Sequence, residues 1–195
     1  MTLPNVISVA RLLCAPLFLW LLFGADERLA AFGLLGGLGA TDWVDGWIAR
    51  HFDQGSALGK VLDPVADRVL LLTAAVALTA DGAVPLWVGI AVLVREGIVS
   101  AATLALAAAG AARIDVQWVG KAGTFATMFA LPGFLLVDTL GAGTGRDLAE
   151  IATWIATAGG LVFGYYATAR YVPLAREALH SGRAAGTAPP TGVAA

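Results

Sequence analysis

Long apolar runs, separated by short polar or glycine-containing breaks, follow one another along almost the whole chain. Each of six segments reaches or exceeds the ~20 residues that an α-helix needs to cross a bilayer. These segments lie at about residues 5–23, 28–50, 57–80, 84–112, 116–137 and 148–172. Backbone groups in lipid must find their hydrogen bonds within the protein, which an α-helix achieves by itself. The pattern therefore predicts an all-α integral membrane protein, a bundle of six transmembrane helices.

The composition agrees with a protein that lies in a membrane. Hydrophobic residues make up 58% of the 195 residues and the mean hydropathy is +0.79, which excludes a soluble globular domain. The formal net charge is −2, and the twelve lysines and arginines are spread over the chain, so no basic face for nucleic acid is expected. Cys14 is the only cysteine, which rules out an intramolecular disulfide.

Lysine and arginine are unevenly distributed between the two ends of the predicted helices. With six helices both termini lie on one side of the membrane, and most of these residues fall on that side. They are Arg11, Arg50, Lys60, Arg68, Arg113, Lys121, Arg170, Arg176 and Arg183, against Arg28 and Arg146 in the opposite loops. Because positive residues accumulate on the cytoplasmic side, the N- and C-termini are predicted to be cytoplasmic. The protein is thus expected to be a multi-pass protein of the cell (inner) membrane.

The composition changes near the C-terminus. Residues 183–195 are small and polar and include Pro189 and Pro190, a composition typical of a disordered tail. No internal repeat divides the rest of the chain. We therefore expect one membrane domain over residues 1–182, followed by a disordered C-terminal tail over residues 183–195.

Four aspartates lie near the facing ends of the second and third segments, in a chain with only 13% charged residues. Carboxylates in apolar surroundings are costly unless they bind or pair with a cation, which makes them candidates for a functional site. Asp42 and Asp45 are three residues apart and Asp63 and Asp67 are four apart, so each pair projects from one face of a helix. A hairpin of the two helices would bring the four carboxylates together. Such oxygen ligands suit a hard divalent cation, Mg²⁺ in particular.

The aspartates belong to a longer pattern, D-x-x-D-G-x-x-A-R-x8-G-x3-D-x3-D. Its eight fixed positions are Asp42, Asp45, Gly46, Ala49, Arg50, Gly59, Asp63 and Asp67. This pattern resembles the signature of the CDP-alcohol phosphatidyltransferases, and so many fixed positions are seldom filled by chance. The resemblance implies an enzyme of glycerophospholipid biosynthesis that transfers a phosphatidyl group from CDP-diacylglycerol to the hydroxyl of an acceptor alcohol and releases CMP.

The resemblance also implies a role for each aspartate. Asp42, Asp45 and Asp63 are expected to hold two divalent ions, Mg²⁺ or Mn²⁺, and the first two also belong to the nucleotide site. Asp67 is expected to complete the second metal site and to act as the catalytic base for the attacking hydroxyl. Two such ions clamp the attacking and leaving oxygens of a displacement at phosphorus. The family further implies membrane lipids as surroundings and a possible homodimer.

The other residues of the signature are expected to bind the nucleotide. Gly46 and Ala49 leave room for the cytidine close to the backbone. Arg50 contacts a phosphate, because its planar guanidinium fits phosphate oxygens. Gly59 lets the chain approach the nucleotide closely. With the predicted orientation, this site lies near the cytoplasmic face of the membrane.

Three basic residues are candidates for binding a phosphate of the acceptor. Arg95 lies beside Glu96 in the middle of an apolar segment, where charges are costly. Arg68 follows Asp67 directly, and Lys121 lies early in the fifth segment. An alternative for Arg95 and Glu96 is a structural ion pair that fixes helix packing. For Lys121 the alternative is a side chain that extends to the membrane interface.

The acceptor itself stays open between glycerol 3-phosphate and phosphatidylglycerol. Leu3-Pro4-Asn5 and residues 59–68 resemble the phosphatidylglycerophosphate synthase and cardiolipin synthase branch of the family. Arg95-Glu96 is similar to the enzymes that use glycerol 3-phosphate, whereas residues 120–125 resemble actinobacterial cardiolipin synthases.

Two other classes of protein remain as alternatives. A Mg²⁺-dependent membrane prenyltransferase also uses aspartate-rich motifs, but its motif spacing and helix number differ. A cation-coupled transporter would have symmetric halves, and helices 5 and 6 contain no counterpart of the aspartate cluster. Metal-dependent release of CMP from CDP-diacylglycerol would separate the three classes.

Overall fold

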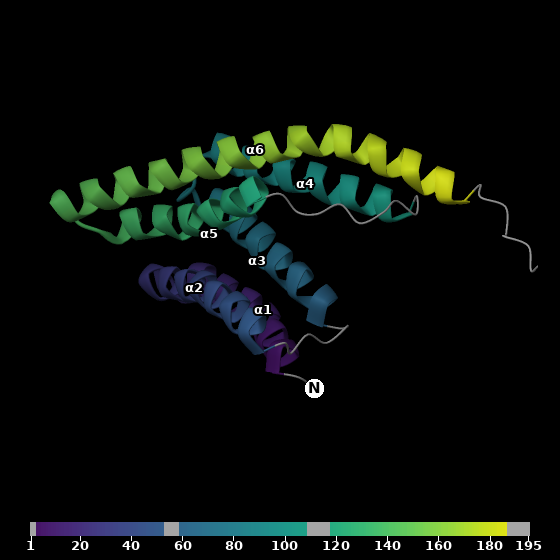
Figure 1. Cartoon of the computed structure of the whole chain (residues 1–195). Coiled ribbons are helices and arrows are strands. Elements are labelled where there is room, and N and C mark those ends of the chain that lie inside the picture. Colours follow the sequence, from purple (N-terminus) through teal and green to yellow (C-terminus); the bar gives the residue numbers. More distant parts are fainter. Residues whose placement is uncertain (1–2, 53–58, 109–117, 187–195) are drawn as a thin grey trace, which may run out of the picture.

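The computed structural model describes the backbone of residues 3–52, 59–108 and 118–186, and the side chains of residues 9–41, 65–104 and 118–170. Apart from short connections, this backbone is helical (Figure 1). The elements are α1 (Leu3–Leu19), a short π-helix η1 (Trp20–Gly24), α2 (Arg28–Phe52), α3 (Gly59–Asp81), α4 (Leu86–Ala108), α5 (Trp118–Thr139) and α6 (Thr144–Gly186). The predicted all-α class is confirmed for the described part of the chain.

Successive helices run in alternating directions through the molecule (Figure 1). The predicted breaks lie where expected, since α2 begins at Arg28 and α3 ends in a turn at Gly82. Gly82 has a φ of +90°, a conformation that a residue without a side chain adopts readily. The second to fifth predicted segments agree with α2 to α5 to within a few residues at each end.

The first predicted segment, residues 5–23, is divided between two kinds of helix. Pro16 lies inside α1 and has no backbone N–H to donate to the preceding turn. The chain then widens into η1, where the backbone N–H of Ala25 donates to the carbonyl of Trp20 at 2.8 Å. The apolar run is therefore helical throughout, but its last turn is a π-turn that periodicity does not predict.

The last helix is longer than the sixth predicted segment. α6 contains 43 residues, which corresponds to about 65 Å and exceeds the ~30 Å of a bilayer core. It includes residues 183–186, which the composition assigns to a disordered tail. Arginine and alanine at 183–185 are good helix formers, and Gly186 is a typical helix end. Residues 187–195 lie outside the described residues, so the division between domain and tail stays a prediction.

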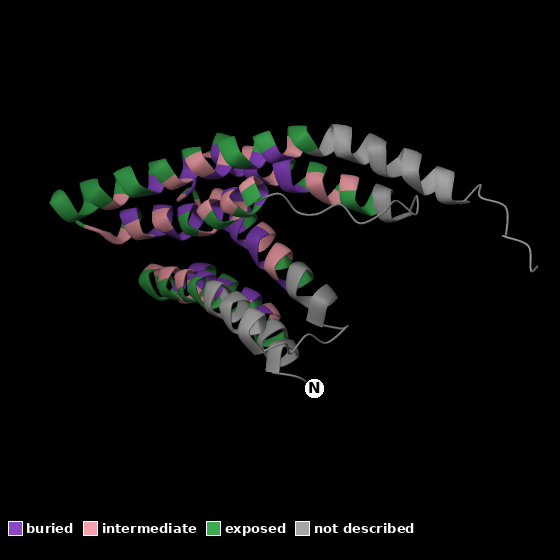
Figure 2. Cartoon of the chain, viewed as in Figure 1, coloured by how far each residue is buried: buried purple, intermediate pink, exposed green. Residues whose placement is uncertain are grey.

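The core of the bundle is centred on α3, which packs against α1, α4 and α5. Figure 2 shows buried positions on the inward faces of the helices and exposed positions on the outward faces. Fully buried members of this core include Phe18 of α1, Leu78 of α3 and Leu135 of α5. α2 packs against α5 and also contacts α1. α3 is therefore flanked by α1 and α4, two helices that carry no residue of the signature.

At the α5–α6 seam, small residues bring the backbones of two helices into contact. A Cβ atom added at Gly123 would lie 2.6 Å from the backbone nitrogen of Gly164. A Cβ added at Gly160 would lie 2.6 Å from the hydroxyl oxygen of Thr127. Small residues at such positions allow the close packing that joins helices in membranes. This seam fixes α6 beside the candidate site described below.

Three helices of the described chain are long and apolar enough to cross a membrane. They are Leu86–Leu104 of α4, Trp118–Thr139 of α5 and Thr144–Arg170 of α6, and Val9–Gly24 forms a shorter apolar helix. The outward positions include many large hydrophobic side chains, such as Leu13, Ile90 and Ile155. An apolar exterior of this kind fits a helical membrane protein.

Candidate active site

The signature residues lie on two helices whose ends precede and follow residues 53–58. Asp42 and Asp45 lie in the last three turns of α2, and Asp63 and Asp67 lie in the first three turns of α3. Along the helix axes, Asp42 is about 15 Å from the end of α2 and Asp67 is about 12 Å from the start of α3. The backbone thus places both pairs at comparable distances from the ends of their helices.

Only part of the predicted site has described side chains. Asp67 and Arg68 are among them, as are Arg95 and Lys121. The side chains of the other signature residues lie outside the described residues, and their roles stay predictions. These residues are Asp42, Asp45, Gly46, Ala49, Arg50, Gly59 and Asp63.

Asp67 contacts an arginine from the first helix. Nη1 of Arg11 donates to Oδ1 of Asp67, and the two residues form an ion pair between α1 and α3. Arg11 is buried, with 3% of its side chain exposed, whereas 30% of the Asp67 side chain is exposed. A buried arginine is therefore aimed at the carboxylate that the resemblance identifies as the catalytic base.

Sequence reasoning did not include Arg11 in the site. The signal that identifies it is the same one that identifies the aspartates, namely a charged residue at the start of a long apolar run. Its partner is 56 residues away in the sequence, so only the packing of α1 along α3 reveals the contact.

A second set of charges lies next to the first. Arg68 follows Asp67 on α3, and its Nε lies 3.6 Å from Oε2 of Glu96 on α4. Nη1 of Arg95 donates to the other carboxylate oxygen, Oε1. Glu96 is thus shared by two arginines that belong to different helices. The structure brings two of the three predicted acceptor-binding residues, Arg68 and Arg95, onto one carboxylate.

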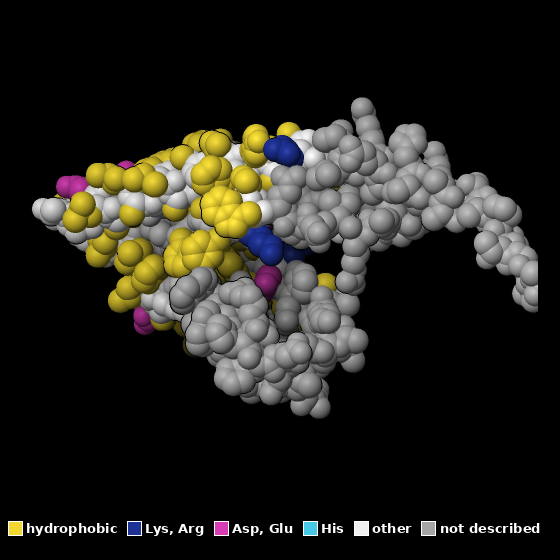
Figure 3. Space-filling view, in the orientation of Figure 1, with side chains coloured by type: hydrophobic (Ala, Val, Ile, Leu, Met, Phe, Trp, Pro, Cys, Tyr) yellow, Lys and Arg dark blue, Asp and Glu magenta, His cyan; other side chains and the backbone are white. Residues whose placement is uncertain are grey.

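Arg95 also connects this charged set to α5 and α6. Its Nη2 donates to the hydroxyl oxygen of Thr124 at 3.2 Å, and that hydroxyl in turn donates to the carbonyl of Gly120. A Cβ atom at Gly164 would lie 2.9 Å from Nε of Arg95, so the guanidinium lies against the backbone of α6. Figure 3 shows basic and acidic side chains close together where the hydrophobic side chains meet the undescribed part of the chain.

Lys121 does not join this set. Its side chain is exposed on α5, and it forms no ion pair with the described part of the chain. Thr124, one turn further along α5, is the residue of this segment that contacts Arg95. The position of Lys121 agrees with the alternative of a side chain that extends to the membrane interface.

Another group of charges lies at the far end of α3, about 21 Å along the helix axis from Asp67. Arg28 lies 2.9 Å from Asp81, 3.3 Å from Asp138 and 3.8 Å from Asp26, and so ties α2, α3 and α5 together. These pairs join the ends of helices and involve no residue of the signature. We assign them a structural role.

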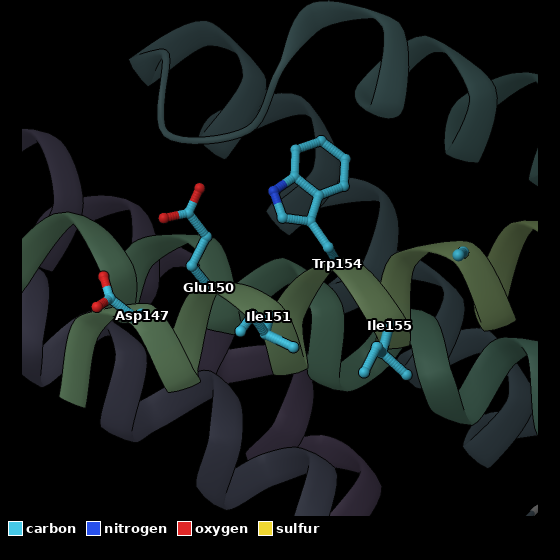
Figure 4. Close-up of a pocket in the computed structure, with 6 residues that line it drawn as sticks. Asp147, Glu150, Ile151, Trp154 and Ile155 are labelled. Atoms are coloured by element: carbon cyan, nitrogen blue, oxygen red, sulfur yellow. The ribbon is translucent and has the colours of Figure 1, made fainter. Parts of the chain in front are cut away.

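A shallow hollow on α6 is also separate from the signature. Its lining residues, which include Asp147, Glu150 and Trp154, all come from this one helix (Figure 4). The ring of Trp154 stacks on that of Trp87 of α4, with 5.9 Å between the ring centroids. It meets the ring of Phe134 of α5 edge-on, with 5.2 Å between the centroids. The hollow is therefore the open side of an aromatic packing cluster.

The signature helices, the membrane-spanning segments and the buried arginines define a class of membrane enzyme. A model of the CDP-alcohol phosphatidyltransferase family matches residues 1–164, and this chain belongs to that family. The predicted family and enzyme class are thereby confirmed. The match favours a phosphatidyltransferase over the prenyltransferase and the transporter.

Two relatives show which enzymes of the family this chain is similar to. The chain is 36% identical over 190 residues to a cardiolipin synthase (CMP-forming) of Streptomyces coelicolor, a match that covers 95% of this chain and 87% of that protein. It is 30% identical over 177 residues to the CDP-diacylglycerol–glycerol-3-phosphate 3-phosphatidyltransferase of Bacillus subtilis, covering 84% of this chain and 91% of that protein. The first name gives a product, cardiolipin, and the second gives an acceptor, glycerol 3-phosphate.

Divalent metals are generally required in this family. Within the described side chains no three His, Cys, Asp or Glu residues converge, but only one of the four signature aspartates is among them. The donor chemistry fits a hard cation, since all four candidate ligands are carboxylates. The guanidinium of Arg11, a positive group, already lies next to the Asp67 carboxylate.

Proposed function

We propose that this protein transfers the phosphatidyl group of CDP-diacylglycerol to a hydroxyl of phosphatidylglycerol, with release of CMP. Two observations support CDP-diacylglycerol as the donor. The signature is complete, and one of its aspartates contacts a buried arginine in a membrane bundle. The acceptor is supported by similarity to a cardiolipin synthase over nearly the whole chain. Glycerol 3-phosphate is the second candidate, because the Bacillus subtilis relative also matches most of the chain.

In the proposed reaction the acceptor oxygen forms a bond to the phosphatidyl phosphorus, and the bond from that phosphorus to the oxygen of CMP breaks. Asp67 takes the proton of the attacking hydroxyl. Arg11 holds the Asp67 carboxylate in place from α1. Most of the catalytic effect in such a displacement comes from positioning and from charge neutralisation at the phosphates.

Asp42, Asp45, Asp63 and Asp67 would hold two Mg²⁺ or Mn²⁺ ions, which when bound neutralise the diphosphate. Asp42 and Asp45 would orient the nucleotide from α2. The other signature residues, Gly46, Ala49, Arg50 and Gly59, would shape the cytidine and phosphate site. Each of these assignments follows from the match between this chain and the family signature, residue by residue.

Arg68 and Arg95 are the proposed ligands for an acceptor phosphate. Both contact Glu96, and Arg68 directly follows Asp67, the proposed base, on α3. Lys121 is the weaker candidate, because it is exposed and lies apart from the two arginines. An arginine fork suits phosphate because it presents parallel N–H groups to two oxygens.

We further propose six membrane crossings with cytoplasmic termini and an active site near the cytoplasmic face of the cell membrane. The alternating helix directions support this topology, and the excess of lysine and arginine supports the orientation. A homodimer stays an expectation from the family.

The experiment is an acceptor panel with purified protein in lipid vesicles. CDP-diacylglycerol and Mg²⁺ are supplied with phosphatidylglycerol, glycerol 3-phosphate, inositol phosphate or serine. CMP release is measured, and the lipid product is identified by mass spectrometry. Cardiolipin formed only with phosphatidylglycerol is the expected result. Phosphatidylglycerophosphate as the main product would select the second candidate, and no CMP release with any acceptor would refute the function.

A further inference from the structure

Glu96 is a buried carboxylate in the middle of a membrane-spanning segment. It lies ten residues into Leu86–Leu104 of α4, about 15 Å along the helix, and only 5% of its side chain is exposed. A charge at this depth is costly unless it is paired, and such residues generally face the interior of a bundle. The described contacts account for both of its oxygens, one toward Arg68 and the other toward Arg95.

A structural ion pair would need only one arginine, and Arg95 already satisfies that requirement. Arg95 is 9% exposed, contacts Glu96 directly and is anchored by Thr124. Arg68 differs, because 37% of its side chain is exposed and it approaches Glu96 with Nε, at the base of the guanidinium. Its two terminal amino groups form no hydrogen bond with the described part of the chain. Glu96 thus contacts Arg68 through Nε, and the two terminal amino groups of Arg68 are directed away from Glu96.

We infer that Glu96 is a positioning residue. It holds the guanidinium groups of Arg68 and Arg95 so that together they bind a phosphate group of the acceptor. This inference rests on the proposed function and says how the site selects its acceptor, which must be an alcohol that bears a phosphate. Both a phosphomonoester and a phosphodiester satisfy the requirement, whereas serine does not. Glu96 touches neither substrate and acts through the two arginines.

The test uses Glu96→Gln in the full-length protein, with initial rates measured against acceptor and against CDP-diacylglycerol. The substitution keeps the size of the side chain and removes the charge that orients two guanidinium groups. We expect the KM for the acceptor to rise about tenfold or more, because charge-assisted contacts are lost, while the KM for CDP-diacylglycerol changes less than about twofold. Glu96→Asp, which keeps the charge, should restore part of the acceptor affinity.

A matched control separates positioning from stability. Asp81→Asn makes the same chemical change at a partly buried carboxylate paired with an arginine, Arg28, but at the far end of α3. It should lower the thermal stability without changing the KM for the acceptor. In an Arg68→Gln background, Glu96→Gln should raise that KM by a smaller factor than in the wild type, because one of the two arginines through which it acts is already gone.

Two results would overturn the inference while leaving the proposed function intact. The first is an active wild-type enzyme in which Glu96→Gln behaves like Asp81→Asn or raises both KM values equally. The second is a wild-type enzyme that accepts serine as well as a phosphorylated alcohol. If Glu96→Gln is not recovered folded, Arg68→Gln decides the question, and an unchanged acceptor KM in that variant also overturns the inference. Failure of the proposed function itself would appear as a wild-type protein that releases no CMP.

Discussion

The ion pair between Arg11 and Asp67 makes a prediction about metal binding that can be measured without turnover. Arg11→Met removes the guanidinium from a buried position and keeps an apolar side chain of similar length. Breaking a buried pair costs about 3–5 kcal/mol and an exposed pair about 0–1 kcal/mol. Because Arg11 is buried and Asp67 is partly exposed, we expect a loss of about 2 kcal/mol in the metal-free protein. For a chain of this length that corresponds to a decrease in Tm of about 4–8 °C.

Added metal should reduce this loss. Without metal, Arg11 is a counter-ion of a signature carboxylate, and its removal leaves that negative charge less balanced. Divalent ions at the proposed sites would replace the missing charge, so the variant gains more from Mg²⁺ than the wild type does. By linkage the variant then binds Mg²⁺ more tightly, by about tenfold if ~1.4 kcal/mol of the loss is recovered.

The assay is thermal unfolding in detergent, followed with chelator and with saturating Mg²⁺, for the wild type and two variants. Arg28→Met is the matched control, because Arg28 pairs with Asp81 and Asp138 at the far end of the bundle. Its decrease in Tm should be the same with and without Mg²⁺. An equal decrease for Arg11→Met in both conditions would refute the coupling between Arg11 and the metal ligands.

Three further predictions concern the base, the metal and the helix seam. Asp67→Asn should reduce kcat by about 10²–10⁴-fold, and turnover close to the wild type would remove Asp67 from the mechanism. Chelation should abolish CMP release and Mg²⁺ or Mn²⁺ should restore it, whereas activity that persists in chelator would contradict the metal sites. Gly123→Ala should destabilise the protein by about 1–3 kcal/mol, because the new Cβ would lie 2.6 Å from the backbone of Gly164. Gly159→Ala, whose Cβ would meet nothing within 4 Å, should leave the Tm unchanged or higher.

Features that depend on short stretches of sequence were predictable. The helices α2 to α5 follow from the lengths of their apolar runs, and Asp63 and Asp67 lie in the first turns of α3 as their spacing indicates. The family also follows from one local signature of 26 residues, because the identity and spacing of its residues carry the chemistry.

Features that depend on how helices meet were not predictable from the same patterns. Arg11 contacts Asp67 because α1 packs along α3, and Glu96 joins Arg68 to Arg95 because α4 packs against α3. Spacing rules relate residues on one helix and give no partner on another. The predicted pair of Arg95 and Glu96 was therefore correct as a contact but incomplete, since Arg68 is the third member.

The two groups of ion pairs in the described bundle differ in the number of arginines that take part. At the far end of α3 three carboxylates surround one arginine, whereas around Asp67 three arginines accompany two carboxylates. The first group is Arg28 with Asp26, Asp81 and Asp138, and the second is Arg11, Arg68 and Arg95 with Asp67 and Glu96. A phosphorylated acceptor and a diphosphate donor are both anions, and Arg68, with 37% of its side chain exposed, can attract them. We infer that metal ions offset the signature aspartates while the arginines bind substrate phosphates, which accounts for both kinds of charge at one level of an otherwise apolar bundle.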